Sequence, residues 1–345
     1  RILKMQSLHP GALAHIAHGE RTSSDSDPLL TRLQQALKQK AISALEREEL
    51  LYALGKTHDD CGQYKQAFDY YQQANSHSRT RCGEYRRDAQ KELIDRVIDH
   101  CNTPWLASIE PVSELPLVFV CGMFRSGTTL LEQILGAHPE LTAGGEIDYF
   151  QRHISAFPAG LRSATPGEID AIGRGYLDQR AHTFRSGARV INKRPDNVLA
   201  LGPLQALFPN ARFIHTQRRT LDNCLSLFFQ PLEPGQPYAN NLLDTGHYYR
   251  QQQRLVRHWQ QLLPQDCLLE VSYEALVQRP RQTVEGVLDF LQVPWSETCL
   301  SFHTNENRVR TASVHQVRQP LHKHSDGRWQ NYAAHLAALR EYLGE

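Results

Sequence analysis

The residues best suited to chemistry lie in a short stretch that follows a hydrophobic run. Residues 122–129 read Gly-Met-Phe-Arg-Ser-Gly-Thr-Thr and come directly after the apolar residues 117–121. A strand, a glycine-bounded loop and a helix start, in this order, would point several backbone N–H groups and the positive end of a helix dipole at one spot. We therefore predict a phosphate or sulfate site formed by Arg125, Ser126, Gly127, Thr128 and Thr129.

This loop lacks the lysine of an ATP-type phosphate loop. In that loop a glycine, four residues and a second glycine are followed by a lysine and then a serine or threonine. Gly122 and Gly127 have this spacing, but Thr128 takes the place of the lysine and Arg125 lies inside the loop. The substitution indicates an anion site whose positive charge comes from an arginine. A simple tight turn is the alternative interpretation.

A second anion site is indicated by Arg218 and Ser226. Residues 211–216 predict a buried strand, and residues 221–229 predict the helix that follows it. Arg218 leaves the end of this strand, which is where open α/β sheets bind ligands. Its planar guanidinium suits a phosphate, and Ser226 adds a hydroxyl donor. Taken alone, the pair could equally be a surface arginine and a serine on a helix face.

A carboxylate and a lysine complete the set of candidate residues. Glu146 follows two glycines that leave little hindrance around it, so its carboxylate could take a proton from a reacting group. Asp148 is a nearby competitor for this role. Lys193 follows the predicted strand 189–192 and could reach the same cleft. Either side chain could also be an ordinary solvated residue.

The composition narrows the classes of protein that are compatible with the chain. Its 345 residues, 40% of them hydrophobic, are enough for about two domains. A net charge of +1 gives no general attraction to nucleic acid or to an anionic membrane. The 7 cysteines lack metal-ligand spacing, so we expect no metal site and a reducing, cytoplasmic environment. No apolar stretch approaches the ~20 residues of a membrane span. The chain begins at Arg1, which leaves a removed signal peptide open.

The pattern of elements changes near residue 104. Residues 30–100 read as helices, and residues 54–74 have small and aromatic residues at the places a tetratricopeptide repeat (TPR) requires. After a proline-rich linker at 102–116, strands alternate with helices, which is typical of a parallel sheet covered on both faces. We predict an α/β fold with a P-loop-type parallel sheet, preceded by an all-α TPR-like segment. The predicted domains are 1–103 and 104–345. An ordinary helical hairpin is nearly as good an interpretation of the first.

At these residues the sequence resembles the sulfotransferases that use 3′-phosphoadenosine 5′-phosphosulfate (PAPS). The resemblance covers roughly residues 115–335 and is greatest to bacterial TPR-containing sulfotransferases, with protein-tyrosine sulfotransferases more distant. Residues 125–129 look like the 5′-phosphosulfate loop, and Arg218 with Ser226 look like the 3′-phosphate pair. Glu146 and Lys193 lie in segments that resemble those carrying the general base and the catalytic lysine of the tyrosine enzymes.

Two further segments carry the resemblance less specifically. Tyr273 lies in a segment similar to the one that places a tyrosine near the adenine, and residues 316–320 resemble a late loop that closes over the nucleotide. This late loop has Gln319 where a lysine often stands, which leaves Arg318 to supply the charge. The chain also departs from the family after Arg218, where Arg219 and Thr220 replace a pair such as Asp-Pro. In the tyrosine enzymes the base stands two residues after the glycine, whereas here Glu146 follows Gly145 directly.

The resemblance implies transfer of a sulfuryl group from PAPS to an acceptor hydroxyl by in-line displacement, without a metal ion. Glu146 would be the general base, while Arg125 and Lys193 would neutralise the transferred and leaving groups. A peptide or protein tyrosine is favoured as acceptor, with glycans and small phenols or alcohols still open. The TPR-like segment would bind a protein partner, position the acceptor or pack on the catalytic domain. A P-loop nucleotide kinase or NTPase and an inactive TPR adaptor are the alternative classes.

Overall fold

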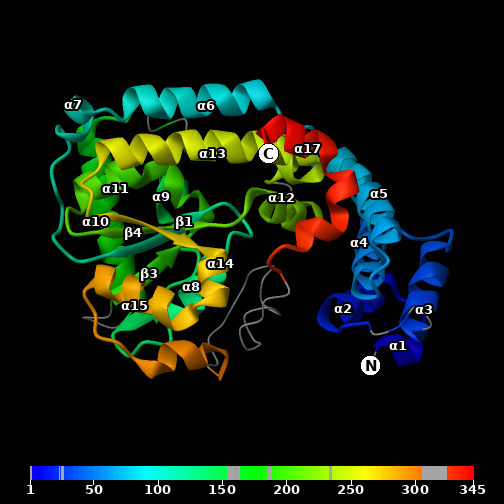
Figure 1. Cartoon of the computed structure of the whole chain (residues 1–345). Coiled ribbons are helices and arrows are strands. Elements are labelled where there is room, and N and C mark those ends of the chain that lie inside the picture. Colours follow the sequence, from blue (N-terminus) through cyan, green and yellow to red (C-terminus); the bar gives the residue numbers. More distant parts are fainter. Residues whose placement is uncertain are drawn as a thin grey trace. The chain divides into compact units, whose positions relative to one another are not determined.

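Segments that are distant in the sequence come together in two separate units in a computed structural model of the chain (Figure 1). The structure describes residues 2–22, 24, 27–153, 160, 164–184, 189–232, 235–304 and 325–345. Unit 1 comprises Arg1–Arg86, Thr220–Tyr248 and His324–Glu345. Unit 2 comprises Arg87–Arg219 and Tyr249–Lys323.

Unit 2 contains a parallel sheet of five strands among the described residues, in the order β2-β3-β1-β4-β5. The strands are β1 (Val118–Gly122), β2 (Leu141–Ala143), β3 (Arg189–Lys193), β4 (Arg212–Gln217) and β5 (Leu268–Ser272). The predicted α/β class with a parallel sheet is confirmed. The short edge strand β2 was not predicted, because three residues beside two glycines carry almost no pattern.

Alternating side chains of β1 enter two hydrophobic cores, one on each face of the sheet. Val118 and Val120 belong to a core that includes residues of α8 (Thr128–Leu135) and α15 (Pro280–Leu291). Phe119 and Cys121 belong to the opposite core, which includes Trp259. The central strand β1 is therefore buried on both faces, and its carboxyl end is fixed between β3 and β4.

Further helices of unit 2 cover the sheet (Figure 1). Their bounds are α6 (Arg87–His100), α7 (Thr103–Leu106), α9 (Tyr149–His153), α10 (Pro166–Thr183), η2 (Pro195–Ala200), α11 (Leu201–Leu207), α14 (Tyr273–Gln278) and η4 (Glu297–Thr304). Between β3 and β4, residues 195–207 thus form a 3₁₀ turn followed by a short α-helix. Helix α13 (Leu242–Leu262) contributes residues to both units.

Unit 1 is built around a helical hairpin. Helix α4 (Ala44–Asp60) begins with a capping box at Ser43, and α5 (Tyr64–Cys82) follows a turn in which Gly62 has φ 73°. At Gly55 an added Cβ would lie 2.7 Å from the ring of Tyr71, so glycine lets the two helices approach closely. The hairpin lies where the sequence predicts TPR-like helices. Its identity as a repeat stays a prediction.

Aromatic side chains of this hairpin pack on segments from the later part of the chain. Tyr71 stacks on Phe229 with ring centroids 3.9 Å apart, and Phe68 stacks on His335 at 4.1 Å. The same core includes residues of α12 (Thr220–Phe228), η5 (Arg328–His335) and α17 (Ala337–Leu343). The other described helices of unit 1 are α1 (Ile2–Met5), α2 (Pro10–Gly19), α3 (Pro28–Leu37) and η3 (Pro237–Asn240).

A buried asparagine ties the hairpin to α12. Asn75 donates its side-chain N–H groups to the carbonyl of Tyr71 at 2.8 Å and to that of Phe228 at 2.7 Å, and it accepts the hydroxyl of Tyr52 at 3.0 Å. These bonds satisfy the buried amide, which would otherwise be costly. Unit 1 therefore joins N-terminal helices to segments beyond residue 219, whereas the domain division at residues 103/104 remains a prediction from the sequence.

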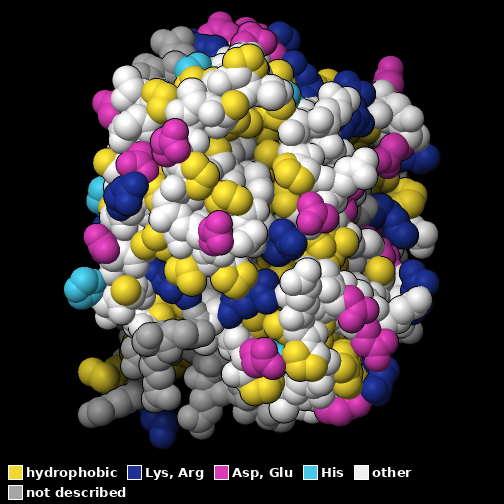
Figure 2. Space-filling model, turned by 90° about the vertical axis from the view of Figure 1, so that its left-hand side faces the viewer, with side chains coloured by type: hydrophobic (Ala, Val, Ile, Leu, Met, Phe, Trp, Pro, Cys, Tyr) yellow, Lys and Arg dark blue, Asp and Glu magenta, His cyan; other side chains and the backbone are white. Residues whose placement is uncertain are grey.

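The surface carries no dominant charge on the face drawn in Figure 2. Lysine and arginine side chains are interspersed there with aspartate and glutamate, and hydrophobic side chains are scattered among them (Figure 2). This agrees with the net charge of +1. Binding of an anion must therefore depend on cations placed locally.

None of the described helices is both long and apolar enough to traverse a bilayer.

Candidate functional site

The loop between β1 and α8 has an unusual backbone. Arg125 has φ 68° and Gly127 has φ 104°, both in the left-handed region. For Arg125 this conformation costs about 1–3 kcal/mol, and it persists only where the surroundings impose it. Gly127 is followed at once by Thr128, the first residue of α8, and the first N–H groups of a helix lack partners within it. This arrangement suits an anion.

The loop is fastened to β4. The hydroxyl of Ser126 donates to the Met123 carbonyl at 2.6 Å and lies 2.7 Å from Thr216 Oγ1. An added Cβ at Gly122 would lie 2.5 Å from the Thr216 carbonyl oxygen, so a side chain cannot be accommodated there. The backbone N–H of Ser126 also bonds to Met123, at 3.1 Å. Ser126 therefore maintains the shape of the loop, and the helix start at Thr128 and Thr129 is the part suited to a ligand.

Arg218 lies beside this loop in unit 2. Its Nη1 donates to the Arg125 carbonyl at 3.3 Å, and its guanidinium carbon lies 4.8 Å from the centre of the Tyr273 ring. The side chain of Tyr273 in turn faces the loop, because a Cβ added at Gly127 would lie 2.9 Å from Tyr273 Cδ2. The structure thus brings together Arg125, Gly127, Arg218 and Tyr273, which come from three separate motifs.

Glu146 and Lys193 form an ion pair in unit 2. Lys193 Nζ lies 2.6 Å from Glu146 Oε1, and the lysine side chain is 1% exposed against 37% for the glutamate. Lys193 is paired with Val120 of β1 in the sheet register, two residues before the loop begins at Gly122. An accessible carboxylate therefore meets a buried cation near the carboxyl end of the sheet. Asp148, the competing candidate, pairs instead with Arg152 at 2.8 Å.

Glu132 is a residue that the sequence reasoning missed. It lies on α8, is 3% exposed, and accepts the backbone N–H of Gly145 at 2.7 Å. Burial raises the pKa of its carboxyl to about 7, and the nearby charge of Lys193 acts in the opposite direction. Glu132 stands four residues after Thr128 and so shares a helix face with it. That spacing was the only available signal, because a lone helical glutamate is most often solvated.

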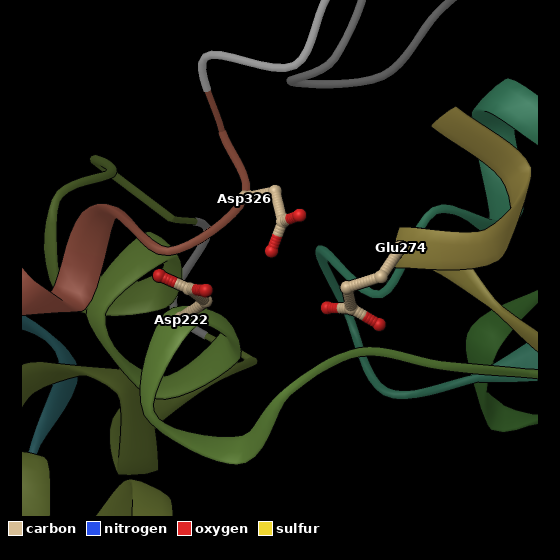
Figure 3. Close-up of side chains that lie close together, drawn as sticks. All are labelled: Asp222, Glu274 and Asp326. Atoms are coloured by element: carbon tan, nitrogen blue, oxygen red, sulfur yellow. The ribbon is translucent and has the colours of Figure 1, made fainter. Parts of the chain in front are cut away.

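Ser226 lies in unit 1 on α12 and is 9% exposed. Figure 3 shows Asp222 on the same helix and Asp326 in the segment that leads into η5. Asp222 accepts the backbone N–H groups of Gly327 and Trp329, each at 2.8 Å, and so fixes the start of η5 to α12. Glu274, also drawn there, belongs to unit 2, where it accepts the backbone N–H of Arg219 at 2.8 Å. The pairing of Ser226 with Arg218 stays a prediction.

Arg318 and the late loop 316–320 lie outside the described residues. Their predicted role in closing over a nucleotide is therefore an expectation from the sequence alone.

The chain is similar to known sulfotransferases. A family model described as "Sulfotransferase family" matches residues 116–297, just over half of the chain. A protein of Aquifex aeolicus is 27% identical over 340 residues, covering 93% of this chain and 44% of that protein. The protein-tyrosine sulfotransferase of Drosophila melanogaster is 27% identical, covering 63% of this chain and 47% of its own length. Protein-tyrosine sulfotransferase 2 of Gallus gallus is 24% identical, covering 67% and 70%.

This chain spans less than half the length of the Aquifex and Drosophila relatives. The matched family region nevertheless runs from just before β1 to the start of η4 and contains the loop, the Glu146–Lys193 pair, Arg218 and Tyr273. The sequence resemblance is thereby confirmed at the level of the family: the chain belongs to the sulfotransferase family and is related to the protein-tyrosine sulfotransferases.

Proposed function

We propose that this chain transfers the sulfuryl group of PAPS to an acceptor hydroxyl. The observation that carries the proposal is the contact set of the loop, Arg218 and Tyr273 within unit 2. The loop backbone and the start of α8 would hold the 5′-phosphate, while Arg218 is the cation for the 3′-phosphate and Tyr273 an aromatic face for the adenine. Two phosphate sites distinguish PAPS from a nucleotide with a single polyphosphate chain.

The acceptor chemistry is assigned to the Glu146–Lys193 pair. Glu146 would take the proton from the acceptor hydroxyl as the acceptor oxygen bonds to sulfur and the bond from sulfur to the bridging oxygen of the donor breaks. Lys193 and Arg125 would stabilise the negative charge that develops on the leaving phosphate. The positive charge in this scheme comes from the protein, so it assigns no role to a metal ion.

The tyrosine-sulfotransferase relatives favour a peptide or protein tyrosine as acceptor. A phenolic hydroxyl has a pKa near 10, so a carboxylate base must act on it while the departing charge is stabilised at the same time. The proximity of Glu146 to Lys193 supports a single site for both tasks. We assign to the N-terminal helices a packing role in unit 1, since their aromatic residues contact α12 and η5. A TPR-type protein partner is the further expectation.

Nucleotide binding gives the first test. The product 3′-phosphoadenosine 5′-phosphate (PAP) should raise the melting temperature of the protein well above the rise produced by ADP with Mg²⁺. A larger effect of ADP with Mg²⁺ would favour the kinase or NTPase class. Binding of PAP without turnover of labelled PAPS, against a panel of tyrosine peptides, sugars and phenols, would favour the inactive adaptor.

Removal of the base gives the second test. Glu146→Gln should leave PAP affinity nearly unchanged and lower kcat about 10²- to 10⁴-fold, the usual range for general base catalysis. Asp148→Asn is the matched control, because Asp148 lies two residues away and pairs with Arg152 instead of Lys193. Full turnover by Glu146→Gln, or an equal loss in Asp148→Asn, would overturn the assignment of the base.

A further inference from the structure

Glu132 connects the helix that begins at the loop with the turn that carries Glu146. Helix α8 starts at Thr128, and Glu132 lies one turn further on. Its carboxyl oxygen Oε1 accepts the N–H of Gly145 at 2.7 Å, directly before Glu146 in the chain. Of the two side chains, Glu132 is buried and Glu146 is partly exposed. The buried carboxyl therefore contacts the backbone of the turn, and the accessible one extends from it.

The rest of this turn is fastened to β3. The N–H of Gly144 bonds to the Ile191 carbonyl at 2.9 Å, and the carbonyl of Gly145 accepts the N–H of Lys193 at 3.0 Å. Gly145 has φ 70°, a conformation that glycine adopts without strain. On the α8 side the bond from Glu132 fixes the N–H of Gly145. The turn is thus hydrogen-bonded both to β3 and to α8, and loss of the Glu132 side chain would remove the bond to α8.

A buried carboxyl at this position has a substantial free-energy cost. Desolvation raises the pKa of Glu132 to about 7, and the charge of Glu146 adds to this effect while that of Lys193 reduces it. Its neighbours Leu131, Ile134 and Leu135 on α8 are buried hydrophobic residues, so an apolar side chain would suit packing alone. The polar contact with Gly145 is the interaction that a hydrophobic residue could not make.

We propose that Glu132 is a positioning residue for sulfuryl transfer: by accepting the Gly145 N–H it holds the turn so that the Glu146 carboxylate meets Lys193. This inference rests on the proposed function, since it takes Glu146 as the general base. The role requires a hydrogen-bond acceptor at the side-chain oxygen and does not require a negative charge there. Glutamine can therefore replace Glu132, and alanine cannot.

The experiment compares Glu132→Ala and Glu132→Gln in the full chain. Misplacement of a catalytic group by about 1 Å can cost about 100-fold, so Glu132→Ala should lower kcat by up to about that factor with the KM for PAPS within about threefold of wild type. Glu132→Gln should keep kcat within about fivefold. Leu135→Ala, at another buried residue of the same helix, controls for general destabilisation of α8.

A second readout follows the Gly145 amide without any turnover. In Glu132→Ala its hydrogen exchange should accelerate at least tenfold, whereas the amide of Arg194, which bonds to the Val120 carbonyl, should keep its rate. In Glu132→Gln both amides should exchange as in wild type. The inference is overturned if Glu132→Ala keeps wild-type kcat and Gly145 exchange, if Glu132→Gln loses as much as Glu132→Ala, or if Leu135→Ala loses kcat equally.

Failure of the underlying function would look different. If Glu146→Gln retains turnover, or if the wild-type protein transfers no sulfuryl group, the proposed function fails. The Gly145 amide then still decides whether Glu132 holds the turn.

Discussion

The loop 122–129 and helix α12 are predicted to bind opposite ends of one nucleotide, yet they are built in opposite ways. The loop belongs to unit 2, and its fastening comes from the adjacent strand β4 through Ser126 and Thr216. Helix α12 belongs to unit 1, where Asn75 and the segment at Gly327 fix its two ends. The loop is fixed by a neighbouring strand of its sheet, 90 positions later in the sequence, whereas α12 is fixed by a side chain and a loop backbone that lie more than 100 positions away. The same task is thus predicted for an element fixed by a sheet and for one fixed between helices.

The two regions also differ in how they hold polar groups inside. Unit 2 places a titratable carboxyl, Glu132, against the backbone of a turn. Unit 1 uses Asn75, a neutral amide whose contacts with Tyr52, Tyr71 and Phe228 account for its donors and acceptor. The first arrangement responds to pH and the second does not. Perturbing each region should therefore give a recognisably different response.

The largest expected effect is at Gly122. In Gly122→Ala the new Cβ would meet the Thr216 carbonyl oxygen and Oγ1 at 2.5 and 2.6 Å, on a backbone with φ 146°. Steric overlap and strain should lower the free energy of unfolding by roughly 3 kcal/mol or more in chemical denaturation. Gly286→Ala on α15 is the control, because nothing lies within 4 Å of its added Cβ. It should be neutral or stabilising by about 0.5–1 kcal/mol. Equal stability of the two variants would contradict the close fit of the loop to β4.

The next effect is the pH dependence of stability through Glu132. Its pKa is about 7 in the folded chain and 4.5 ordinarily, so the folded state binds this proton more tightly than the unfolded state does. Stability is therefore lost as the pH rises from about 4.5 to about 7, by up to about 3 kcal/mol, and is constant above that range. Glu132→Gln lacks this loss. Its advantage over wild type in denaturation should grow between these pH values, and parallel curves would count against the buried carboxyl.

The affinity for PAP distinguishes the two predicted phosphate elements directly. Arg218→Ala removes a charged donor and should weaken binding about 10- to 100-fold, whereas Ser226→Ala removes one neutral hydroxyl and should weaken it about 3- to 10-fold. Arg219→Ala, at the exposed neighbouring arginine, should change affinity little. Calorimetry would measure all three. If Ser226→Ala weakened PAP binding and Arg218→Ala did not, the expected order of the two affinity losses would be wrong, and α12 would contribute more to PAP binding than Arg218 does.

A smaller effect is expected in unit 1 at Asn75. Asn75→Ala leaves the Phe228 carbonyl and the Tyr52 hydroxyl without this partner, which should cost about 1–2 kcal/mol of stability. Gln73→Ala, on the same helix but at an exposed residue whose side chain donates to the Asp69 carbonyl, should cost less than about 0.5 kcal/mol. Thermal denaturation of both variants would measure the difference. No greater loss in Asn75→Ala would mean that α12 is held mainly by its aromatic contacts.

The sequence predicted the parts of this fold whose signals are contiguous. The strands β1, β3 and β4 and the glycine loop could be predicted because apolar runs and turn residues follow one another within a few positions. Strand β2 was too short to give a pattern. The bond from Glu132 to Gly145 and the one from Asn75 to Phe228 join residues that only the folded chain brings together. The hydrophobic periodicity of a helix does not distinguish a single buried polar side chain from the solvated polar side chains around it.

In the candidate site, too, residues within short motifs could be predicted from the sequence, whereas contacts made only by folding could not. Arg125, Gly127, Arg218 and Tyr273 could be named from short motifs, and the structure brings them into contact. The ion pair of Glu146 with Lys193 links two segments that the sequence could only suggest would meet at one edge of the sheet. Ser126 was also assigned to the ligand, and this assignment stays a prediction; in the structure its hydroxyl and N–H both bond within the protein. Residue type alone does not reveal which partner a hydroxyl bonds to.

The aromatic core of unit 1 has a consequence for biosynthesis. Phe68 on α5 is translated early, but His335 of η5, on which its ring stacks, emerges roughly 270 residues later. At translation rates of about 5–20 residues per second, the nascent hairpin would wait roughly 10–50 seconds with this ring lacking its stacking partner. During that interval the hairpin would be a natural client for a ribosome-associated chaperone.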